Sequence, residues 1–408
     1  MLRLWSIAAA AGACLMTSGM ASADEKTELH FVVCGDNDAF VYYTNLAKNF
    51  ESENPDITID LEVVAWGKCE SKTISMAAAG DAPDLAYLGS RNAKQLATND
   101  LILPVKISEA KQALYQPGVL QTVRYKGEFW AYPRAFSTKA LYMNCDLFES
   151  AGVACVAPKT WDELYTAAKA VKDKLGIGGI GMAGKAADNT YHQFMNYAYS
   201  NNAELVNADT GEITFNSKNM LETATFFSKL VDVAQNGPAA HDRANLLDLY
   251  NDSKIAMYIE GPWGIKMHTK INNSLIAPLP NGPSGKGGSI LISDSIFVFK
   301  GTGNEEIAMQ LAEAVTDVGE QYIYDGPENL ALTPIYQYEQ AGIQGTYYSA
   351  EKWQPFVAAI AGGGPEPMFI EYKLMQDALV AMVQGIILKD DTPENLVQIA
   401  AEELSELE

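Results

Sequence analysis

Residues 57–89 read ITIDLEVVAWGKCESKTISMAAAGDAPDLAYLG, and this stretch decides the fold class. Its first seven residues alternate apolar and polar side chains, which is typical of a β-strand with one buried face. A helix then ends at residues 77–81, and the Pro83–Asp84 pair leads into a second apolar strand, LAYLG. Because two strands joined through a helix pair in parallel, the stretch predicts a βαβ unit.

The same alternation continues on both sides of this unit. Upstream, residues 29–34 form a short apolar strand, residues 43–50 show helical spacing, and Asn54-Pro55-Asp56 ends that helix. Downstream, a helix begins at its cap Thr160. We also expect strands at 140–144, 255–259 and 296–299, and helices at 191–198, 221–234, 305–317, 374–382 and 393–404. This rhythm predicts an α/β protein with parallel strand pairing.

The composition and net charge of the chain argue against one class of binding partner. The chain has 408 residues, enough for two domains, and its hydrophobic content of 48% is ordinary for a globular protein. Its formal net charge is -22, and a chain this acidic repels phosphate backbones. We therefore expect no nucleic-acid partner.

The N-terminus has the pattern of a secretory signal peptide. Arg3 supplies the positive charge, residues 4–16 form a short apolar core, and Ala21-Ser22-Ala23 fits a cleavage site. We expect residues 1–23 to be removed by cleavage after Ala23, and the mature protein to be periplasmic. The alternative, a lipoprotein anchored through Cys14, lacks the usual leucine three residues earlier.

Four cysteines remain after this cleavage, and export to an oxidising compartment favours two disulfides. Cys145 and Cys155 are close in sequence. Cys34 ends one predicted strand and Cys69 follows the next, so parallel neighbouring strands would bring them together. We therefore predict Cys34–Cys69 and Cys145–Cys155. A zinc site is the rival interpretation, but no C-x-x-C occurs and the histidines lack i, i+4 spacing, so we expect no metal.

The stretch GIGGIGMAG, residues 176–184, contains the spacing G-x-G-x-x-G twice. A dinucleotide-binding loop needs a strand before the first glycine and a helix that starts within the motif. Here a predicted helix precedes the glycines, and the next helical pattern starts only near Asn189. Glu204 stands about where a ribose-binding carboxylate would, but one acidic residue is a weak signal. We interpret the glycines as part of a strand and its exit turn, and we expect no cofactor.

Motifs for catalysis give no stronger signal. The chain contains no G-x-S-x-G nucleophile elbow and no H-E-x-x-H zinc motif. Acidic residues are plentiful, so a glycosidase pair of carboxylates stays open, although nothing in the sequence marks one. We expect a protein that is not an enzyme.

Five stretches, taken in order, resemble the extracytoplasmic solute-binding proteins of ABC importers, in the sugar-binding group that includes maltose-binding protein. They are FESENPDITIDLE (50–62), AAAGDAPDLAYLG (77–89), FWAYPRAFSTKALYMNCDLFESAGVACVAPKTWDEL (129–164), NDSKIAMYIEGPWGI (251–265) and GTGNEEIAMQLAEAVTD (301–317). Single motifs such as GPW are common by chance, but the ordered set is specific.

The resemblance implies a two-lobed periplasmic binding protein fold, in which each lobe is a mostly parallel sheet flanked by helices. The chain would cross between lobes near residues 137–140, 289–293 and 332–335. The N-terminal lobe would hold residues 24–136 and 292–333, and the C-terminal lobe residues 137–291 and 334–408. A solute that contacts both lobes favours the closed form, which the importer's membrane permease subunits could read as occupancy. We expect a monomer.

The resemblance also implies a ligand site between the lobes, made of an aromatic platform and polar groups for sugar hydroxyls. Trp263 in GPW matches the family's platform tryptophan, although a buried core tryptophan would give the same pattern. The other candidates follow predicted strands, flank the first crossing, open a helix or lie near the C-terminus: Asp36, Asn37, Asp38, Trp66, Tyr87, Ser90, Arg91, Arg134, Ser137, Tyr191, His192 and Tyr372. Ser90 stands where some relatives carry a carboxylate, a departure that weakens the case for maltose itself.

These features predict high-affinity binding of a carbohydrate, either a mono- or oligosaccharide or a polyol, and its delivery to an ABC importer. An anionic solute, such as a sugar acid or a glycerol phosphate ester, is the alternative within the same fold. Arg91 and Arg134 motivate it, because arginine pairs well with carboxylate and phosphate; Arg134 could equally form a salt bridge between the lobes. An exported glycosidase is the alternative of another class.

Overall fold

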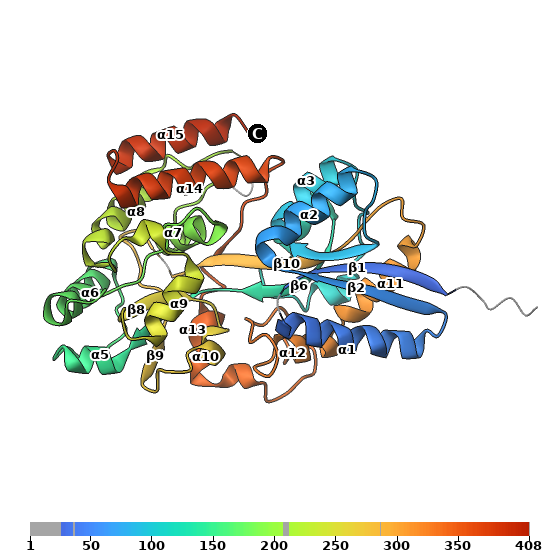
Figure 1. Cartoon of the computed structure of the whole chain (residues 1–408), viewed down its shortest axis with the longest axis horizontal. Helices are drawn as coiled ribbons and strands as arrows, with labels where there is room; N and C mark the ends of the chain where they lie inside the picture. The colour runs from blue at the N-terminus through green and yellow to red at the C-terminus, as the bar shows by residue number, and fades with distance from the viewer. Residues whose placement is uncertain (1–25, 36, 207–211, 286, 408) are drawn as a thin grey trace, which may run out of the picture.

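A computed structural model describes residues 26–407 apart from 36, 207–211 and 286. The predicted signal peptide, its cleavage site and the candidate Asp36 therefore lie outside the described residues. The described chain forms two α/β lobes that lie side by side, with several segments passing between them (Figure 1). The two-lobed α/β fold expected from the sequence is confirmed.

The first lobe is built on a six-stranded sheet in the order β11-β10-β3-β1-β2, with β6 also paired to β10. β1 (Thr27–Cys34) runs parallel to β2 (Ile57–Val64) and β3 (Leu85–Gly89), as the opening stretch predicts. β10 (Ile290–Val298) runs antiparallel to β3 and to β6 (Tyr132–Ser137), and parallel to β11 (Gly364–Pro365).

Helices cover both faces of this sheet (Figure 1). α2 (Trp66–Ala78) and α3 (Ala93–Thr98) lie on one face, whereas α1 (Asn37–Glu53), α11 (Glu305–Val315) and α12 (Val318–Asp325) lie on the other. The candidates Asn37 and Asp38 are the first two residues of α1. The lobe also contains α4 (Glu109–Gln112) and a hairpin of β4 (Arg124–Tyr125) and β5 (Glu128–Phe129).

The second lobe has a three-stranded sheet in the order β8-β7-β9. β7 (Ala140–Asn144) runs antiparallel to both β8 (Met257–Glu260) and β9 (Ser274–Ala277). The parallel pairing expected for this lobe is therefore wrong for its named strands. β8 and β9 run in the same direction, and β7 lies between them in the opposite direction. Parallel pairing is limited to single bridges, such as the one between Gly178 and Ile255.

Helices surround the second sheet. Their bounds are α5 (Cys145–Ser150), α6 (Trp161–Leu175), α7 (Asp188–Ser200), α8 (Lys218–Leu230), α9 (Arg243–Asn251), α10 (Gly264–Met267), α14 (Tyr372–Leu388) and α15 (Pro393–Ser405). α13 (Gln354–Ala358) packs near the junction with the first lobe. α14 is longer than the predicted 374–382. It packs against α7, α8 and α15, so it is apolar on several sides, and its apolar residues do not show a clear helical spacing in the sequence.

Three distant parts of the chain meet where the lobes join. Thr138, between β6 and β7, donates its backbone N–H to the Thr333 side chain at 3.0 Å and its hydroxyl to the Phe356 carbonyl at 2.7 Å. The neighbouring Lys139 donates its backbone N–H to the Ser289 hydroxyl at 3.0 Å. These bonds tie together the regions in which the sequence predicts the three crossings.

The glycine-rich stretch does not form a nucleotide-binding loop. Gly176 ends α6 in the left-handed conformation, with φ of 70°, and α7 begins only at Asp188. Gly179 lies against α6 so closely that an added Cβ would sit 2.0 Å from the Ala168 carbonyl oxygen. The stretch contributes single bridges rather than the strand we expected. Its glycines serve close packing of backbone on backbone.

Both predicted disulfides are confirmed. Cys34 at the end of β1 is bonded to Cys69 in the first turns of α2, and Cys145 is bonded to Cys155. The first bond fixes the start of α2 to β1, an inner strand between β3 and β2. Trp66 and Glu70 lie on that part of α2, so the disulfide also positions them.

Candidate functional site

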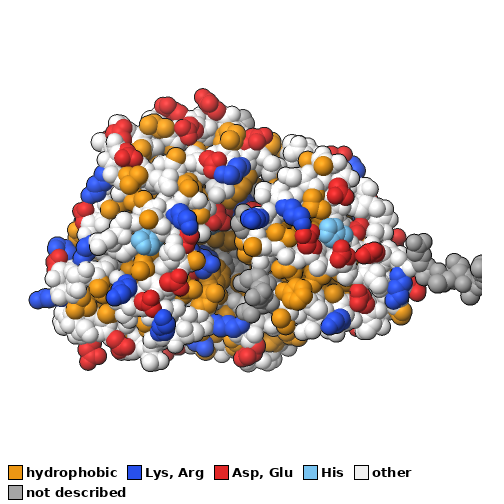
Figure 2. Space-filling view, viewed as in Figure 1, with side chains coloured by type: hydrophobic (Ala, Val, Ile, Leu, Met, Phe, Trp, Pro, Cys, Tyr) orange, Lys and Arg blue, Asp and Glu red, His pale blue; other side chains and the backbone are white. Residues whose placement is uncertain are grey.

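A cavity of about 370 Å³ lies between the two lobes. Figure 2 shows a hollow between the two halves of the molecule, with acidic, basic and hydrophobic side chains around it. Six of the sequence-predicted ligand-binding residues line the cavity, and they come from both lobes and from the crossing segments: Trp66, Tyr87, Arg91, Ser137, His192 and Trp263.

Trp66 and Tyr87 form an aromatic wall on the side of the first lobe. Trp66 is the first residue of α2 and is 40% exposed, which is unusual for so large an apolar side chain. Its ring meets that of Tyr87 edge-on, with 5.7 Å between the centroids. Trp66 therefore offers a flat apolar surface to the cavity.

Asp294 brings a carboxyl group into the cavity from the crossing strand β10. It accepts a hydrogen bond from the Tyr87 hydroxyl at 3.3 Å. Burial raises the pKa of Asp294 to about 7, although the nearby Arg91 lowers it. At neutral pH this carboxyl can therefore be present in either form, as an acceptor alone or as a donor and acceptor.

Trp263 lines the opposite side of the cavity, just after β8. Its ring folds back over Gly261, where an added Cβ would lie 2.4 Å from ring carbon Cη2, so only glycine fits there. Two cations lie next to the ring: Lys139 Nζ is 4.1 Å and Arg243 Cζ is 5.5 Å from its centroid. Trp263 is half-buried, so it is neither a fully exposed platform nor a fully buried core residue.

The cations beside Trp263 differ in their partners. Arg243 at the start of α9 pairs with the buried Glu260, with 3.0 Å between Nη1 and Oε2. Lys139 donates to the Ser137 hydroxyl at 3.1 Å. Burial lowers the pKa of Lys139 to about 8, and the Coulombic attraction of Glu260 only partly offsets this.

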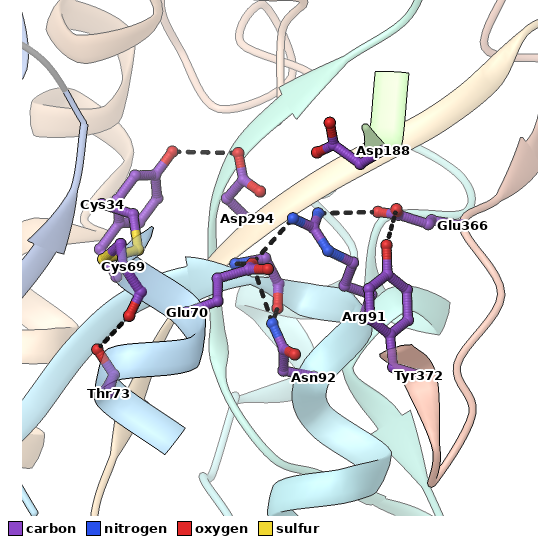
Figure 3. A network of polar contacts seen from close by, with 12 residues as sticks. Cys34, Cys69, Glu70, Thr73, Arg91, Asn92, Asp188, Asp294, Glu366 and Tyr372 are labelled. Carbon is purple, nitrogen blue, oxygen red and sulfur yellow. Dashed lines mark hydrogen bonds and ion pairs between the residues drawn. A yellow bond between two sulfur atoms is a disulfide. The ribbon is translucent and has the colours of Figure 1, made fainter. Parts of the chain in front are cut away.

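Arg91 lines the cavity and links the first lobe to the second (Figure 3). Its guanidinium lies 2.9 Å from Glu70 Oε1 on α2 and 3.2 Å from Glu366 Oε2, which follows β11. It also lies over the Tyr372 ring, 5.4 Å from the centroid. Figure 3 shows Asp188 and Asp294 near this guanidinium, and both line the cavity. Arg91 thus stands at the centre of several carboxylates.

Glu366 is held from the second lobe by three further side chains. Its Oε1 accepts from the Tyr191 hydroxyl at 2.5 Å and the Tyr372 hydroxyl at 3.0 Å, and it lies 2.6 Å from His192 Nε2. Burial alone would raise the pKa of Glu366, but Arg91 and these hydrogen bonds outweigh it and hold the pKa well below its usual range. Glu366 is therefore a buried carboxylate anchored to both lobes.

Among the predicted residues whose side chains the structure describes, four do not reach the lining of the cavity. Tyr191 and Tyr372 are buried behind His192, in the Glu366 network. Ser90 is buried and its hydroxyl lies 3.0 Å from that of Ser293 and 2.6 Å from that of Ser295, both on β10. These three side chains can therefore affect a solute only indirectly, through the residues that lie between them and the cavity.

Arg134 is the fourth and lies farther away. It is fully buried in the first lobe, over the Tyr324 ring at 3.7 Å and close to Tyr42 and Tyr43. It donates to the Gln321 side chain at 2.6 Å and to the Val315 carbonyl. The structure therefore places it in a core cage of aromatic rings, not in a salt bridge between the lobes.

Several residues that line the cavity were missed by the sequence reasoning. Asp188 and Asn196 lie one turn before and after His192, at i, i+4 spacing, so the face of α7 that carries His192 could have revealed them. Lys139 and Asp294 carry no such signal, because Lys139 directly precedes β7, which has no charged residue, and Asp294 is the only charged residue of β10. Arg243 and Glu260 also line the cavity.

No helix among the described residues combines the length and apolar character needed to cross a membrane. No group of three or more His, Cys, Asp or Glu within this part of the chain has the geometry of a metal site.

The sequence profile of the bacterial extracellular solute-binding protein family matches residues 36–322. The chain belongs to this family. Its members bind solutes outside the cytoplasm, so the resemblance inferred from the five stretches is confirmed.

Individual proteins are similar to this solute-binding protein over most of its length. A binding protein of Brucella abortus (strain 2308) is 26% identical over 369 residues, which are 88% of each chain. The galactooligosaccharide-binding protein of Bacillus subtilis (strain 168) is 24% identical over 241 residues, or 57% of this chain and 56% of its own. A solute-binding protein of Thermotoga lettingae, crystallised with α-D-tagatose, superposes with a TM-score of 0.82 at 23% identity, covering 94% of this chain and 100% of its own. This last likeness shows the fold.

Proposed function

We propose that this protein binds a carbohydrate, either a mono- or oligosaccharide or a polyol, in the cavity between its lobes. The observation that carries the proposal is the presence of two tryptophans, Trp66 and Trp263, on opposite sides of one cavity that is otherwise rich in polar groups. A sugar ring has an apolar face that stacks on aromatic rings and an edge of hydroxyls that need hydrogen-bonding partners. Both needs are met in this cavity.

The charges around the cavity favour a neutral solute. The lining contains four basic residues, Arg91, Lys139, Arg243 and Lys266, and three acidic ones, Asp188, Glu260 and Asp294. Glu70 and Glu366 balance Arg91 further. The anionic alternative depended on Arg91 and Arg134 together, and Arg134 is buried away from the cavity. A neutral carbohydrate therefore has the better support.

The similar proteins support the same class of solute. The names of two of them mention a galactooligosaccharide and tagatose, both carbohydrates. These names belong to those proteins, and a few side chains decide the ligand in each case. They support the class of solute rather than a particular sugar.

The proposal includes the route of the solute. The mature protein, formed by cleavage after Ala23, would act in the periplasm as a monomer and pass the solute to the permease of an ABC importer. Residues 24–136 with 292–333 would form one moving lobe, and residues 137–291 with 334–408 the other. The protein would carry out no chemistry on the solute.

A thermal-shift screen followed by titration calorimetry tests the proposal. The probes are maltose, mannitol, tagatose, mannotriose and galactooligosaccharides, with glucuronate and glycerol 3-phosphate as anionic comparisons. A solute present at about 100 times its dissociation constant should add about 2.7 kcal/mol to the stability. Stabilisation by the anions alone, or by none of the probes, would contradict carbohydrate binding. Turnover of chromogenic glycosides would contradict the non-enzymatic role.

Small-angle scattering tests the movement of the lobes. A bound carbohydrate should reduce the radius of gyration, because the solute favours the closed form. An unchanged profile at saturation, from a free protein that is demonstrably open, would contradict closure as the signal.

A further inference from the structure

We propose that Lys139 is a specificity-determining residue, whose ammonium group donates to an oxygen of the bound solute beside the Trp263 ring. This inference rests on the proposed carbohydrate-binding function, because it names a donor within that same cavity. It goes further, because it assigns a direct contact with the solute to one side chain. That side chain belongs to a crossing segment rather than to either lobe.

The first argument is the position of the side chain. The Lys139 backbone lies between β6 and β7, where its N–H is fixed by the Ser289 hydroxyl at 3.0 Å. Its side chain lines the cavity but is only 7% exposed. A lysine usually keeps its charged end in water, so the burial of this ammonium needs a structural reason.

The second argument is the number of hydrogen-bond donors on the Lys139 ammonium group. An ammonium group has three N–H donors. Among the described residues, Lys139 Nζ gives one hydrogen bond, to Ser137 Oγ at 3.1 Å, and rests 4.1 Å from the Trp263 ring centroid. It forms no ion pair within this part of the chain, because the nearby Glu260 is paired with Arg243. Lys139 thus has donor capacity left for a solute.

The third argument is the electrostatic surroundings. Charged and titratable groups face the cavity around Lys139 from every neighbouring element: Glu260 on β8, Arg243 on α9, Asp294 on β10, Asp188 and His192 on α7, Arg91 after β3, Lys266 on α10, and Glu366 behind them. Burial outweighs the attraction of these carboxylates and lowers the pKa of Lys139 to about 8. The ammonium is therefore poorly solvated, and an oxygen from a solute would improve its surroundings.

The position next to an indole fixes the chemistry of the preferred solute. A ring that stacks on Trp263 and carries a hydroxyl or ring oxygen at its edge would place that oxygen next to Nζ. A solute with an amino cation at the same edge would instead meet Lys139 and Arg243, and would be rejected by like charge. Lys139 therefore selects oxygen-bearing over amino-bearing rings.

The test compares Lys139→Met, which keeps the length of the side chain but removes its donors, with Lys139→Arg, which keeps the charge. Each is titrated with maltose, mannitol, tagatose and mannotriose. We expect Lys139→Met to bind the tightest wild-type probe about ten- to hundredfold more weakly, as for a lost hydrogen bond to a charged group, and Lys139→Arg to retain more of the affinity. Lys172→Met is the control, because Lys172 is half-buried and donates to the Ala234 carbonyl outside the cavity.

A solute-free measurement keeps the test independent of folding and of the choice of sugar. The fluorescence of Trp263, obtained as the difference between the wild type and Trp263→Phe, should change near pH 8 as Lys139 loses its proton. The change should be absent from Lys139→Met and from Lys139→Gln, which serves if the Met variant does not fold.

The outcomes separate the two proposals. A wild type that binds none of the probes overturns the carbohydrate assignment and this inference with it. A wild type that binds a probe, with Lys139→Met within twofold of it, overturns the role of Lys139 alone. Fluorescence of Trp263 that does not respond to deprotonation of Lys139 at any pH overturns an electrostatic contact between the ammonium and the indole.

Discussion

Arg91 and Glu366 join the two lobes directly, with 3.2 Å between Nη1 and Oε2 and both side chains buried. Each has further partners on its own side. Glu70 shares the guanidinium, whereas Tyr191, His192 and Tyr372 share the carboxylate. A buried charged bridge with partners on both sides therefore links the two lobes.

Removing the charge of Glu366 should destabilise the protein. In Glu366→Gln, Arg91 keeps only Glu70 as a carboxylate partner, and the buried network loses charge-assisted hydrogen bonds. We expect a loss of about 1–3 kcal/mol in the free energy of unfolding, measured by urea denaturation. Glu371→Gln is the matched control, because Glu371 lies close in sequence but is exposed. Equal stability of the two variants would show that the bridge contributes nothing measurable.

Trp263→Ala separates a role in binding from a role in packing. If the ring stacks on the solute, the affinity should fall by about 1–3 kcal/mol, or roughly ten- to hundredfold, and the melting temperature should stay near that of the wild type. If the ring mainly fills the core, the stability should fall by about 3–5 kcal/mol. Trp66→Ala is the comparison, since Trp66 is more exposed and should cost less stability.

Asp294 should make the protein less stable as the pH rises. Its pKa is raised by burial from 3.8 to about 7 in the folded protein, so over this interval the folded form keeps a proton that the unfolded form has released. The contribution of Asp294 to the free energy of unfolding must then fall as the pH increases from about 4 to about 7. Asp294→Asn should lack this component, so its stability relative to the wild type should rise over the same interval. A constant difference in denaturation midpoint across these pH values would contradict the raised pKa.

Reduction of the disulfides should lower the stability, and more so for the disulfide that closes the longer loop. The chain-entropy relation gives about 4 kcal/mol for Cys34–Cys69, whose partners are 35 residues apart, and about 3 kcal/mol for Cys145–Cys155, which are 10 apart. Thermal unfolding of Cys34→Ala/Cys69→Ala and Cys145→Ala/Cys155→Ala measures each contribution. Non-reducing peptide mapping checks the pairing, and a Cys69–Cys145 peptide would contradict it.

The sequence predicted the first lobe well because its signals are local. The alternation in residues 57–63 and the apolar run of β3 directly report strands with one and two buried faces. The antiparallel pairing of β7 was not predictable in this way, because it depends on two strands that lie more than a hundred residues downstream.

The candidate site was harder to predict, since the sequence does not show where a side chain points. Ser90 and Arg91 follow the same strand, yet Arg91 reaches the cavity and Ser90 bonds to β10 beneath it. Arg134 belongs to a residue type that often contacts a solute, but it lies among tyrosines from α1 and α12. Such outcomes depend on packing between segments that are far apart along the chain.

The glycines of residues 176–184 have a consequence for how mutational data on this protein should be read. At Gly179 an added methyl group would overlap the Ala168 carbonyl, and at Gly178 it would lie 2.8 Å from the Gln235 backbone nitrogen. Neither glycine lines the cavity. In a saturation scan scored by growth on a transported sugar, both positions should tolerate replacement as poorly as a ligand contact does. Positions that do not tolerate substitution will therefore include both the closely packed glycines of the second lobe and the residues of the binding site. A parallel scan that measures protein abundance is needed to separate packing positions from binding positions.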